Sequence, residues 1–220
     1  ELAKKTVINE KHLVTANKVM IATKGEVLIN LANKNLVSIN FEASVAGGIP
    51  IIRLIQNSLL SGNISGIYGI LNGTCNYILT QMRENKISFS SALLKAQKLG
   101  FAEANPHDDI SGMDTAYKLS ILSNLTYGIQ TKIKDVYIEG IANIQEIDLR
   151  MAEKLKYAIL LLGISNYKKQ NLLQRVHPCL VSKDSMLSKV HNEINTVVLE
   201  DSHAGKVVIV GKGAGEMPTA

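Results

Sequence analysis

The sequence of 220 residues predicts a mixed α/β fold, in which a β-sheet with antiparallel hairpins is backed by helices. Three observations indicate this class. Segments with helical spacing of apolar residues dominate the first half of the chain, and apolar segments of strand length dominate the second half. Glycine and proline separate many of these segments, and no internal repeat or low-complexity linker occurs. We therefore expect one continuous domain.

The first part of the chain is predicted to contain a strand that runs into a glycine turn and then a helix. Apolar and polar residues alternate at 36–42, which is typical of a strand. Pro50 follows Gly47 and Gly48, and proline suits the first turn of a helix. The predicted elements are short apolar segments at 6–8 and 13–15, helices at 17–24 and 51–60, and the strand at 36–42.

The middle of the chain is predicted to be mainly helical. Asn72-Gly73 is a strong turn signal after a strand, and Thr74 is a candidate cap for the helix that follows. Gly100 suits the C′ position of one helix, and Gly128 ends another. The predicted elements are a strand at 64–71 and helices at 76–85, 88–99 and 112–125.

After Thr131 the sequence changes to short apolar segments typical of strands. Their mixed spacing favours a sheet that contains antiparallel hairpins and packs against the helices of the first half. The predicted elements are a helix at 146–156 and strands at 136–140, 157–164, 172–181, 196–200 and 206–210.

Composition excludes several classes of function. The net charge of +5 is mild, tryptophan is absent, and no nucleic-acid-binding motif occurs, so we expect no nucleic-acid partner. No apolar run approaches the ~18 residues of a membrane span, and no signal peptide is visible. The five histidines show no ligand spacing, and Cys75 and Cys179 form no disulfide framework. These features predict a soluble cytoplasmic protein without a transition metal.

Both ends of the sequence look cut. The chain starts with Glu1 inside a helical pattern, and it stops at Ala220 where a helix is expected to begin. We therefore expect this sequence to be a fragment of a longer protein.

The densest cluster of charged residues lies at 100–118. Asp114 and Lys118 stand four residues apart, so on a helix they share one face. In one interpretation Ser111 and Asp114 form a capping box, and the pair with Lys118 is an ordinary surface ion pair. In the other, the carboxylates of this segment hold a cationic substrate group while the lysine moves a proton. Spacing alone leaves both interpretations open.

A second candidate site is the glycine turn at 41–50. Glycine lets the backbone approach a ligand closely. Helix N–H groups would favour an anion there, whereas backbone carbonyls together with Glu42 would favour a hard cation. A purely structural turn is an equal alternative.

Three further segments give weaker signals. Residues 69–77 read as a type I′ turn with a helix cap, and residues 14–18 deliver Lys18 at a turn. The glycines at 211–215 suggest a dinucleotide-binding fingerprint, but Glu216 stands where its last glycine is required and no βαβ unit follows. We interpret this segment as a glycine turn that can contact a phosphate.

Taken in order, these segments resemble homoserine dehydrogenase, and the resemblance covers essentially the whole chain. The segments that carry it are 14–18, 41–50, 69–77, 99–118, 174–178 and 213–220. The resemblance implies reversible reduction of L-aspartate 4-semialdehyde to L-homoserine with NADP or NAD, on the route to threonine, methionine and isoleucine.

The resemblance also implies roles for individual residues. Lys118 matches the proton donor to the carbonyl oxygen, and Glu103 and Asp114 match the acids that hold the substrate. The residues that match cofactor contacts are Lys18, Gly100, Gly213 and Gly215. Those that match a monovalent-cation site, for a cation such as Na⁺, are Glu42 and the backbone carbonyls of Val45, Gly47 and Ile49.

In domain terms, the resemblance implies the catalytic part of a two-domain Rossmann-type dehydrogenase that forms a homodimer or homotetramer. Residues 1–35 then end the dinucleotide-binding domain, 36–210 form the catalytic and dimerisation domain, and 211–220 begin the return to the first domain. Two alternatives are a non-catalytic dimerising remnant of this fold and a related semialdehyde oxidoreductase. The residue that would distinguish NAD from NADP lies outside this sequence.

Overall fold

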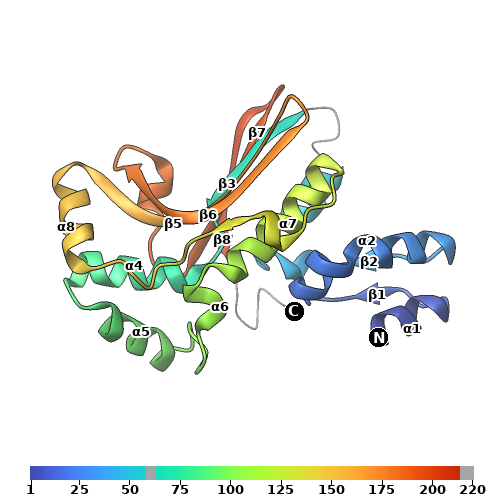
Figure 1. Cartoon of the computed structure of the whole chain (residues 1–220), viewed down its shortest axis with the longest axis horizontal. Coiled ribbons are helices and arrows are strands. Elements are labelled where there is room, and N and C mark those ends of the chain that lie inside the picture. Colours follow the sequence, from blue (N-terminus) through green and yellow to red (C-terminus); the bar gives the residue numbers. More distant parts are fainter. Residues whose placement is uncertain (58–62, 214–220) are drawn as a thin grey trace.

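The computed structural model describes residues 1–57 and 63–213, and it has the predicted mixed α/β architecture (Figure 1). A long twisted sheet occupies the middle of the molecule. Helices α4, α5 and α8 lie towards one end of it, and α1 and α2 lie at the other end with a second, small sheet. The helix α7 runs along the large sheet between these two ends.

The large sheet has six strands in the order β4-β6-β5-β3-β7-β8. Neighbouring strands in this sheet are antiparallel, except that β4 runs parallel to β6. The predicted hairpins are present as β5–β6 and β7–β8, and β3 pairs with both of them from the centre. The strands are β3 (Ile64–Ile70), β4 (Tyr137–Ile138), β5 (Tyr157–Lys168), β6 (Asn171–Ser182), β7 (Ile194–Asp201) and β8 (Gly205–Lys212).

The small sheet contains two parallel strands, β1 (Leu13–Val14) and β2 (Ile39–Asn40), with α2 (Lys18–Lys34) between them in the sequence. The predicted helix at 17–24 thus continues for another ten residues, because Leu28 and Ala32 extend its buried face. The predicted strand at 36–42 is reduced to two residues. Leu36 has a positive φ of 54°, and a 3₁₀ turn, η1 (Glu42–Ser44), begins directly after Phe41. Alternation of apolar residues could not reveal these two bends.

The remaining helices include those predicted from residue 51 onwards, and two further helices, at 2–8 and 107–110, are not among those predicted. Together they are α1 (Leu2–Ile8), α3 (Ile51–Asn57), α4 (Gly73–Asn85), α5 (Phe89–Lys98), α6 (His107–Ile110), α7 (Met113–Tyr127) and α8 (Glu146–Lys154). Three short 3₁₀ turns complete the described residues, namely η1, η2 (Ile133–Asp135) and η3 (Met186–Lys189). Residues 58–60 of the predicted helix at 51–60 lie outside the described part of the chain.

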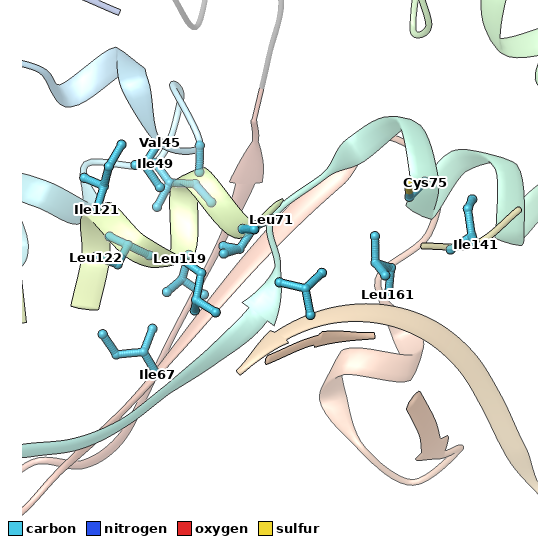
Figure 2. Packing of buried hydrophobic residues seen from close by; sticks show 14 of the residues in the cluster. Val45, Ile49, Ile67, Leu71, Cys75, Leu119, Ile121, Leu122, Ile141 and Leu161 are labelled. Carbon is cyan, nitrogen blue, oxygen red and sulfur yellow. The ribbon is translucent and has the colours of Figure 1, made fainter. Parts of the chain in front are cut away.

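The main core lies between α7 and the sheet (Figure 2). Leu119 and Leu122 of α7 are buried together with Ile67 of β3 and Leu161 of β5. Burial of one such side chain stabilises a fold by about 1.5–3 kcal/mol. Gly163 of β5 lies directly below α7, and a Cβ there would come within 3.1 Å of Thr115. The first turn of α7 therefore packs closely against β5.

Two predicted caps are wrong. Asn72, not Thr74, caps α4, because the Asn72 Oδ1 accepts the Cys75 N–H at 2.7 Å. The backbone of Asn72 is extended, with φ −128° and ψ 110°, so this is not a type I′ turn. At α7 the N-cap is Gly112 with a φ of 87°, and no side chain caps the helix. The capping box proposed for Ser111 is thus absent, since Ser111 ends α6 instead.

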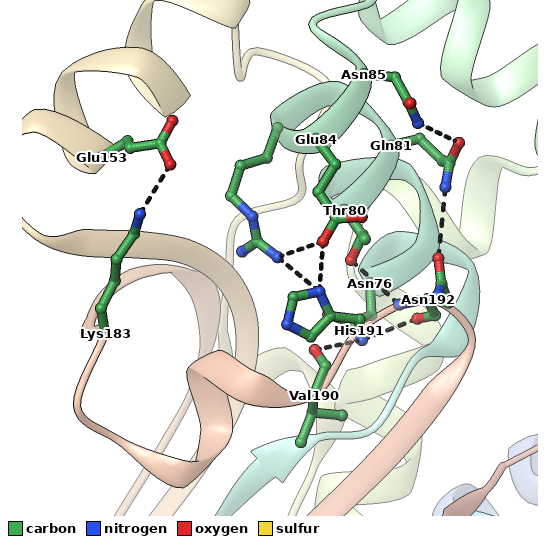
Figure 3. Close-up of polar contacts among 11 residues, drawn as sticks. Asn76, Thr80, Gln81, Glu84, Asn85, Glu153, Lys183, Val190, His191 and Asn192 are labelled. Atoms are coloured by element: carbon green, nitrogen blue, oxygen red, sulfur yellow. Dashed lines mark hydrogen bonds and ion pairs between the residues drawn. The ribbon is translucent and has the colours of Figure 1, made fainter.

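Polar contacts along one side of α4 hold this helix to the loop before β7 (Figure 3). The Asn76 Nδ2 donates to the Asn192 carbonyl at 2.8 Å, and the Asn192 N–H donates to the Thr80 hydroxyl at 3.2 Å. Glu84 contacts His191 one turn further along. These contacts fix the axis of α4 relative to the sheet, and with it the position of Asn72 at the start of the helix.

Within the described residues, none of the helices combines the length and the apolar character that crossing a membrane requires.

Two glycines give a matched test of this packing. Gly69→Ala is expected to destabilise the protein by about 1–3 kcal/mol, because a Cβ there would overlap the Thr196 carbonyl of β7. Gly25→Ala is expected to stabilise it by about 0.5–1 kcal/mol, because Gly25 is inside α2 and its Cβ would make an ordinary 3.5 Å contact with Ile21. Urea unfolding measures both changes. Equal effects of the two substitutions would contradict the described approach of β3 to β7.

Candidate functional site

The centre of the candidate site is the carboxylate of Asp114 in the first turn of α7. Its Oδ2 lies 2.7 Å from the Lys118 Nζ, and its Oδ1 lies 3.0 Å from the Lys18 Nζ. The Asp114 side chain is 6% exposed, that of Lys118 is 11% exposed and that of Lys18 is 39% exposed. The spacing of four residues therefore produces a buried ion pair and not the ordinary surface pair.

Lys18 reaches Asp114 from a separate part of the fold. It is the first residue of α2, four residues after the end of β1, and Asn17 caps the helix by accepting the Met20 N–H at 2.9 Å. The Thr15 hydroxyl oxygen accepts the Asn17 N–H at 3.1 Å and fixes the turn. The strand β1 thus ends in a rigid turn that directs Lys18 towards α7.

Lys118 is also held from the sheet. Its Nζ donates to the Leu71 carbonyl at 2.9 Å, directly after the end of β3. The Asn195 Nδ2 of β7 donates to the same carbonyl at 3.2 Å. An ammonium group has three donors. Two of those of Lys118 are therefore used by Asp114 and Leu71.

Asn72 joins the cluster from the start of α4. Its Nδ2 donates to the Asp114 Oδ2 at 2.8 Å and to the Asp109 Oδ1 at 2.7 Å. Asp109 lies on α6 and its backbone carbonyl accepts from the Cys75 thiol at 3.2 Å. Four helices, α2, α4, α6 and α7, therefore each contribute a charged or amide side chain to one cluster.

The charges of the cluster set its pKa values. Burial alone would raise the pKa of Asp114, but the ammonium groups of Lys118 and Lys18 and the hydrogen bonds from Lys118 and Asn72 outweigh it and lower the pKa to about 2. Burial also opposes the charge of Lys18, yet Asp114 raises its pKa, with Asp109 and Glu103 adding to the effect. Asp114 and Lys18 are therefore both ionised at neutral pH.

Asp109 behaves in the opposite way. Burial raises the pKa of Asp109, and the nearby charge of Asp114 adds to this increase against the hydrogen bond from Asn72. The thiol of Cys75 also has a raised pKa, because of burial and the charges of Asp109 and Asp114. The site thus contains one carboxylate that is strongly held as an anion and another that accepts a proton more easily.

Glu103 and Gly100 lie on the loop after α5. The Glu103 side chain is exposed, and its charge acts on Lys18. The Gln97 amide donates to the Glu103 carbonyl at 3.2 Å and fixes the loop backbone. Gly100 has a φ of 75° with open space around its Cα, which agrees with the predicted C′ position after α5. Their functional roles stay predictions.

Gly213, directly after β8, lies against the buried amide of Asn195. A Cβ on Gly213 would overlap that amide, so only glycine fits there. The Gly213 carbonyl also accepts the Gly47 N–H at 3.1 Å, which joins this residue to the loop at 41–50. Gly215 lies outside the described residues.

The predicted cation ligands occupy the loop that leads into α3. Both carboxylate oxygens of Glu42 accept N–H groups from the start of that helix, those of Ile52 at 2.9 Å and Arg53 at 3.0 Å. The Ile49 carbonyl accepts the Ile51 N–H at 2.7 Å. Val45 and Ile49 are buried, and Gly47 is partly exposed. Within the described residues, no cluster of three His, Cys, Asp or Glu side chains has the geometry of a metal site.

Sequence reasoning missed two members of the cluster. Asn72 precedes a glycine, a pair that favours a turn, and Asp109 is one of several acids in a charged segment. For neither residue does the local sequence distinguish a turn or loop position from a place in the buried cluster. The signal for Asp109 was the grouping of acids before Lys118, but only the tertiary structure shows which acid faces the lysines.

The fold and this cluster define a class of protein: a mixed α/β domain with a buried lysine–carboxylate site at the end of the central strand. The sequence model of the homoserine dehydrogenase family matches residues 50–220. The homoserine dehydrogenase of Helicobacter pylori is 45% identical over all of this chain. The chain belongs to the homoserine dehydrogenase family, which confirms the resemblance seen in the sequence.

Solved structures agree with this assignment. A homoserine dehydrogenase from Thiobacillus denitrificans covers 99% of the chain with 40% identity and a TM-score of 0.96. A hyperthermophilic archaeal homoserine dehydrogenase mutant, solved in complex with NADPH, covers 99% with 30% identity and a TM-score of 0.84. The chain spans 52% of the H. pylori protein, 51% of the T. denitrificans chain and 63% of the archaeal chain. It therefore corresponds to about half the length of the first two.

Asp114 makes a testable contribution to the pH dependence of stability. Its pKa of about 2 in the folded protein lies below the ordinary value of 3.8, so its stabilisation is fully present above pH ~4 and is lost as the pH falls towards 2. We expect Asp114→Asn to remove about 2 kcal/mol of acid-dependent stability between these pH values.

Urea unfolding of the wild type and Asp114→Asn from pH 2 to pH 7 measures this loss. Asp109→Asn is the matched control, since the raised pKa of Asp109 gives a contribution of opposite sign, present below its unfolded pKa and lost as the pH rises. If the free energy of unfolding depended on pH in the same way in the wild type and in Asp114→Asn, the described ion pair of Asp114 and Lys118 would be contradicted.

Proposed function

We propose that the complete protein catalyses the reversible, NAD(P)-dependent interconversion of L-homoserine and L-aspartate 4-semialdehyde. The observation that carries this proposal is the buried cluster of Lys118, Asp114 and Lys18 in a chain of the homoserine dehydrogenase family. A cluster that combines a buried cation with ionised acids suits a substrate that carries an ammonium group at one end and an aldehyde or alcohol at the other.

Lys118 is the proposed proton donor. Reduction of an aldehyde leaves negative charge on its oxygen, and a nearby ammonium group both stabilises that charge and supplies the proton. Two donors of the Lys118 Nζ already bind Asp114 and Leu71, so the third remains for the substrate oxygen. Because the Lys118 side chain is 11% exposed, little water competes for that donor.

Glu103 and Asp114 have different proposed roles. The oxygens of Asp114 already accept from Lys118, Lys18 and Asn72, so we propose that Asp114 acts by holding the two lysines in place. The Glu103 side chain is exposed and lies close enough to act on Lys18. It is therefore proposed to bind the substrate ammonium group.

A nicotinamide cofactor, NADP or NAD, would supply or accept the hydride. The described residues fit such a group: Lys18 is a partly exposed cation beside the proton donor, and the backbone of Gly100 is approachable because open space surrounds its Cα. Gly213 and Gly215 are proposed further contacts. The NADPH complex of the archaeal relative supports this type of cofactor.

The proposed domain organisation and assembly have partial support. The parallel unit β1-α2-β2 is typical of the end of a doubly wound domain, and it continues to Asn40, five residues beyond the proposed boundary at 35.

A second apolar cluster lies on the other face of the large sheet from α7, with Tyr68, Ile164 and Val208 only partly buried. We propose that this face pairs two copies as a homodimer. Cytoplasmic localisation stays a prediction.

Lys118→Ala tests the proposed chemistry. In the full-length protein, we expect it to lower kcat for NAD(P)⁺-linked oxidation of L-homoserine by about 10²–10⁴-fold, because the proton donor is lost. Lys98→Ala on the exposed surface of α5 is the matched control and should keep full activity. Circular dichroism verifies folding of both variants.

Full activity of Lys118→Ala would overturn the assignment of the proton donor. A folded wild type that fails to oxidise homoserine would favour the non-catalytic alternative, and faster turnover of a related amino alcohol would favour another semialdehyde oxidoreductase.

We also propose that Glu42 and the carbonyls of Val45, Gly47 and Ile49 bind a monovalent cation such as Na⁺. Each engaged oxygen of Glu42 and Ile49 keeps lone pairs beyond its single hydrogen bond, so the donor set fits a hard cation. Ligand binding raises stability by RT ln(1 + [L]/Kd), about 0.4 kcal/mol when the concentration of the cation equals Kd.

We therefore expect the wild type to unfold at a higher Tm in NaCl than in choline chloride of equal ionic strength. Glu42→Gln should lose this difference, whereas Glu26→Gln on the exposed side of α2 should keep it. A wild type whose Tm is the same in both salts would contradict the cation site.

A further inference from the structure

Every polar atom of the Asn72 side chain is used within the described site. Asn72 is 4% exposed. Its Oδ1 accepts the Cys75 N–H at 2.7 Å, and its Nδ2 donates to Asp109 at 2.7 Å and to Asp114 at 2.8 Å. A side-chain amide has two N–H donors. One donor therefore goes to each carboxylate.

The chemistry of its neighbours fixes the orientation of this amide. The start of α4 presents an N–H group, which requires the oxygen of Asn72 on that side. The opposite side faces two carboxylates, which require donors. A reversed amide would put its oxygen against two acids, so only one orientation satisfies all partners.

Asn72 also lies next to the residue that holds the other member of the ion pair. The carbonyl of Leu71 binds the Lys118 Nζ at 2.9 Å, while the side chain of Asn72 binds Asp114. These two consecutive residues connect β3, the central strand of the large sheet, to α4. The residues that contact both charged groups therefore directly follow a strand that is paired on both sides.

Asp109 and Asp114 carry like charges at short range, so a group that donates a hydrogen bond to each of them, as Asn72 does, is needed to hold them together. Both approach the same nitrogen within hydrogen-bond distance, and among the described residues no lysine or arginine forms an ion pair with Asp109. The charged or titratable groups that face Asp109 are Asp114 and Lys118 of α7, Lys18 of α2 and Cys75 of α4. Both lysines contact Asp114 directly, so Asn72 is the described side chain that donates to Asp109.

We propose that Asn72 is a positioning residue, which aligns Asp114 with Lys118 and holds Asp109 beside them as a second carboxylate of the site. It acts through these acids and touches neither the substrate nor the reacting atoms. This inference rests on the proposed function for its kinetic consequences, although the bridge itself does not depend on the reaction.

Asn72→Asp separates this role from the cap of α4. Aspartate has the same shape and caps a helix equally well, so α4 keeps its stability. Its carboxylate cannot donate to both acids, and it adds a third negative charge to the cluster. Asn72→Ser also keeps a capping oxygen but is too short to bridge the acids. Asn85→Asp, at the exposed end of the same helix, is the matched control with the same change of charge.

In the full-length protein we expect Asn72→Asp to lower kcat/KM for homoserine by about 100-fold, as misplacement of a reacting group by about 1 Å does. The acid limb of its pH profile should move to higher pH, because three neighbouring carboxylates retain a proton more strongly. Asn72→Ser should lower kcat/KM by about 10–100-fold without this shift of the acid limb. Asn85→Asp should match the wild type. A wild-type pH profile and rate in Asn72→Asp would overturn the proposal.

Carboxyl ¹³C NMR titration of the same proteins tests the bridge independently of activity. The wild type should show one aspartate that stays ionised down to pH ~2 and a second with a raised pKa. In Asn72→Asp both titrations should change, and in Asn85→Asp neither should. Unchanged titrations of both aspartates in Asn72→Asp would overturn the bridge, whether or not the wild type oxidises homoserine. An inactive wild type with the expected titrations would instead reject the proposed function alone.

Discussion

Asp114 lies buried at the start of α7, with Lys118 on one carboxylate oxygen and Lys18 on the other. Removing charges from water is costly, and a buried ion pair is stable only if hydrogen bonds satisfy its remaining groups. Asn72 and the Leu71 carbonyl provide those bonds here. Loss of one partner would leave a buried charge uncompensated, which typically costs about 3–5 kcal/mol. The elements around Asp114 supply the groups that meet this requirement.

The fold brings the partners together through two strand ends. The strand β3 ends at Ile70 and delivers the Leu71 carbonyl and Asn72, while β1 ends at Val14 and delivers Lys18 after a short turn. The helix α7 packs tightly over Gly163 and places Asp114 and Lys118 between these ends. The contacts of α4 with the loop before β7 then hold the cap residue Asn72 in place. The proposed chemistry thus uses positions that the packing of the core already determines.

Much of this arrangement could be predicted from the sequence. The spacing of Asp114 and Lys118 placed them on one helix face, and the hairpins of the second half followed from short apolar segments. Other features depend on distant contacts. An asparagine before glycine favours a turn locally, and only the acids on α6 and α7 reveal Asn72 as a bridge. Lys18 showed a local turn, but its contact with Asp114 joins residues almost a hundred positions apart.

A double-mutant cycle between Asp114 and Lys118 tests most directly whether these residues form one interacting unit. The free energy of unfolding would be measured in urea at pH 7 for Asp114→Asn, Lys118→Met and the double variant. The structure predicts that the losses of unfolding free energy in the two single variants, added together, exceed the loss in the double variant by more than about 1 kcal/mol. Residues in direct contact behave in this way. Losses that add within about 0.5 kcal/mol would contradict it.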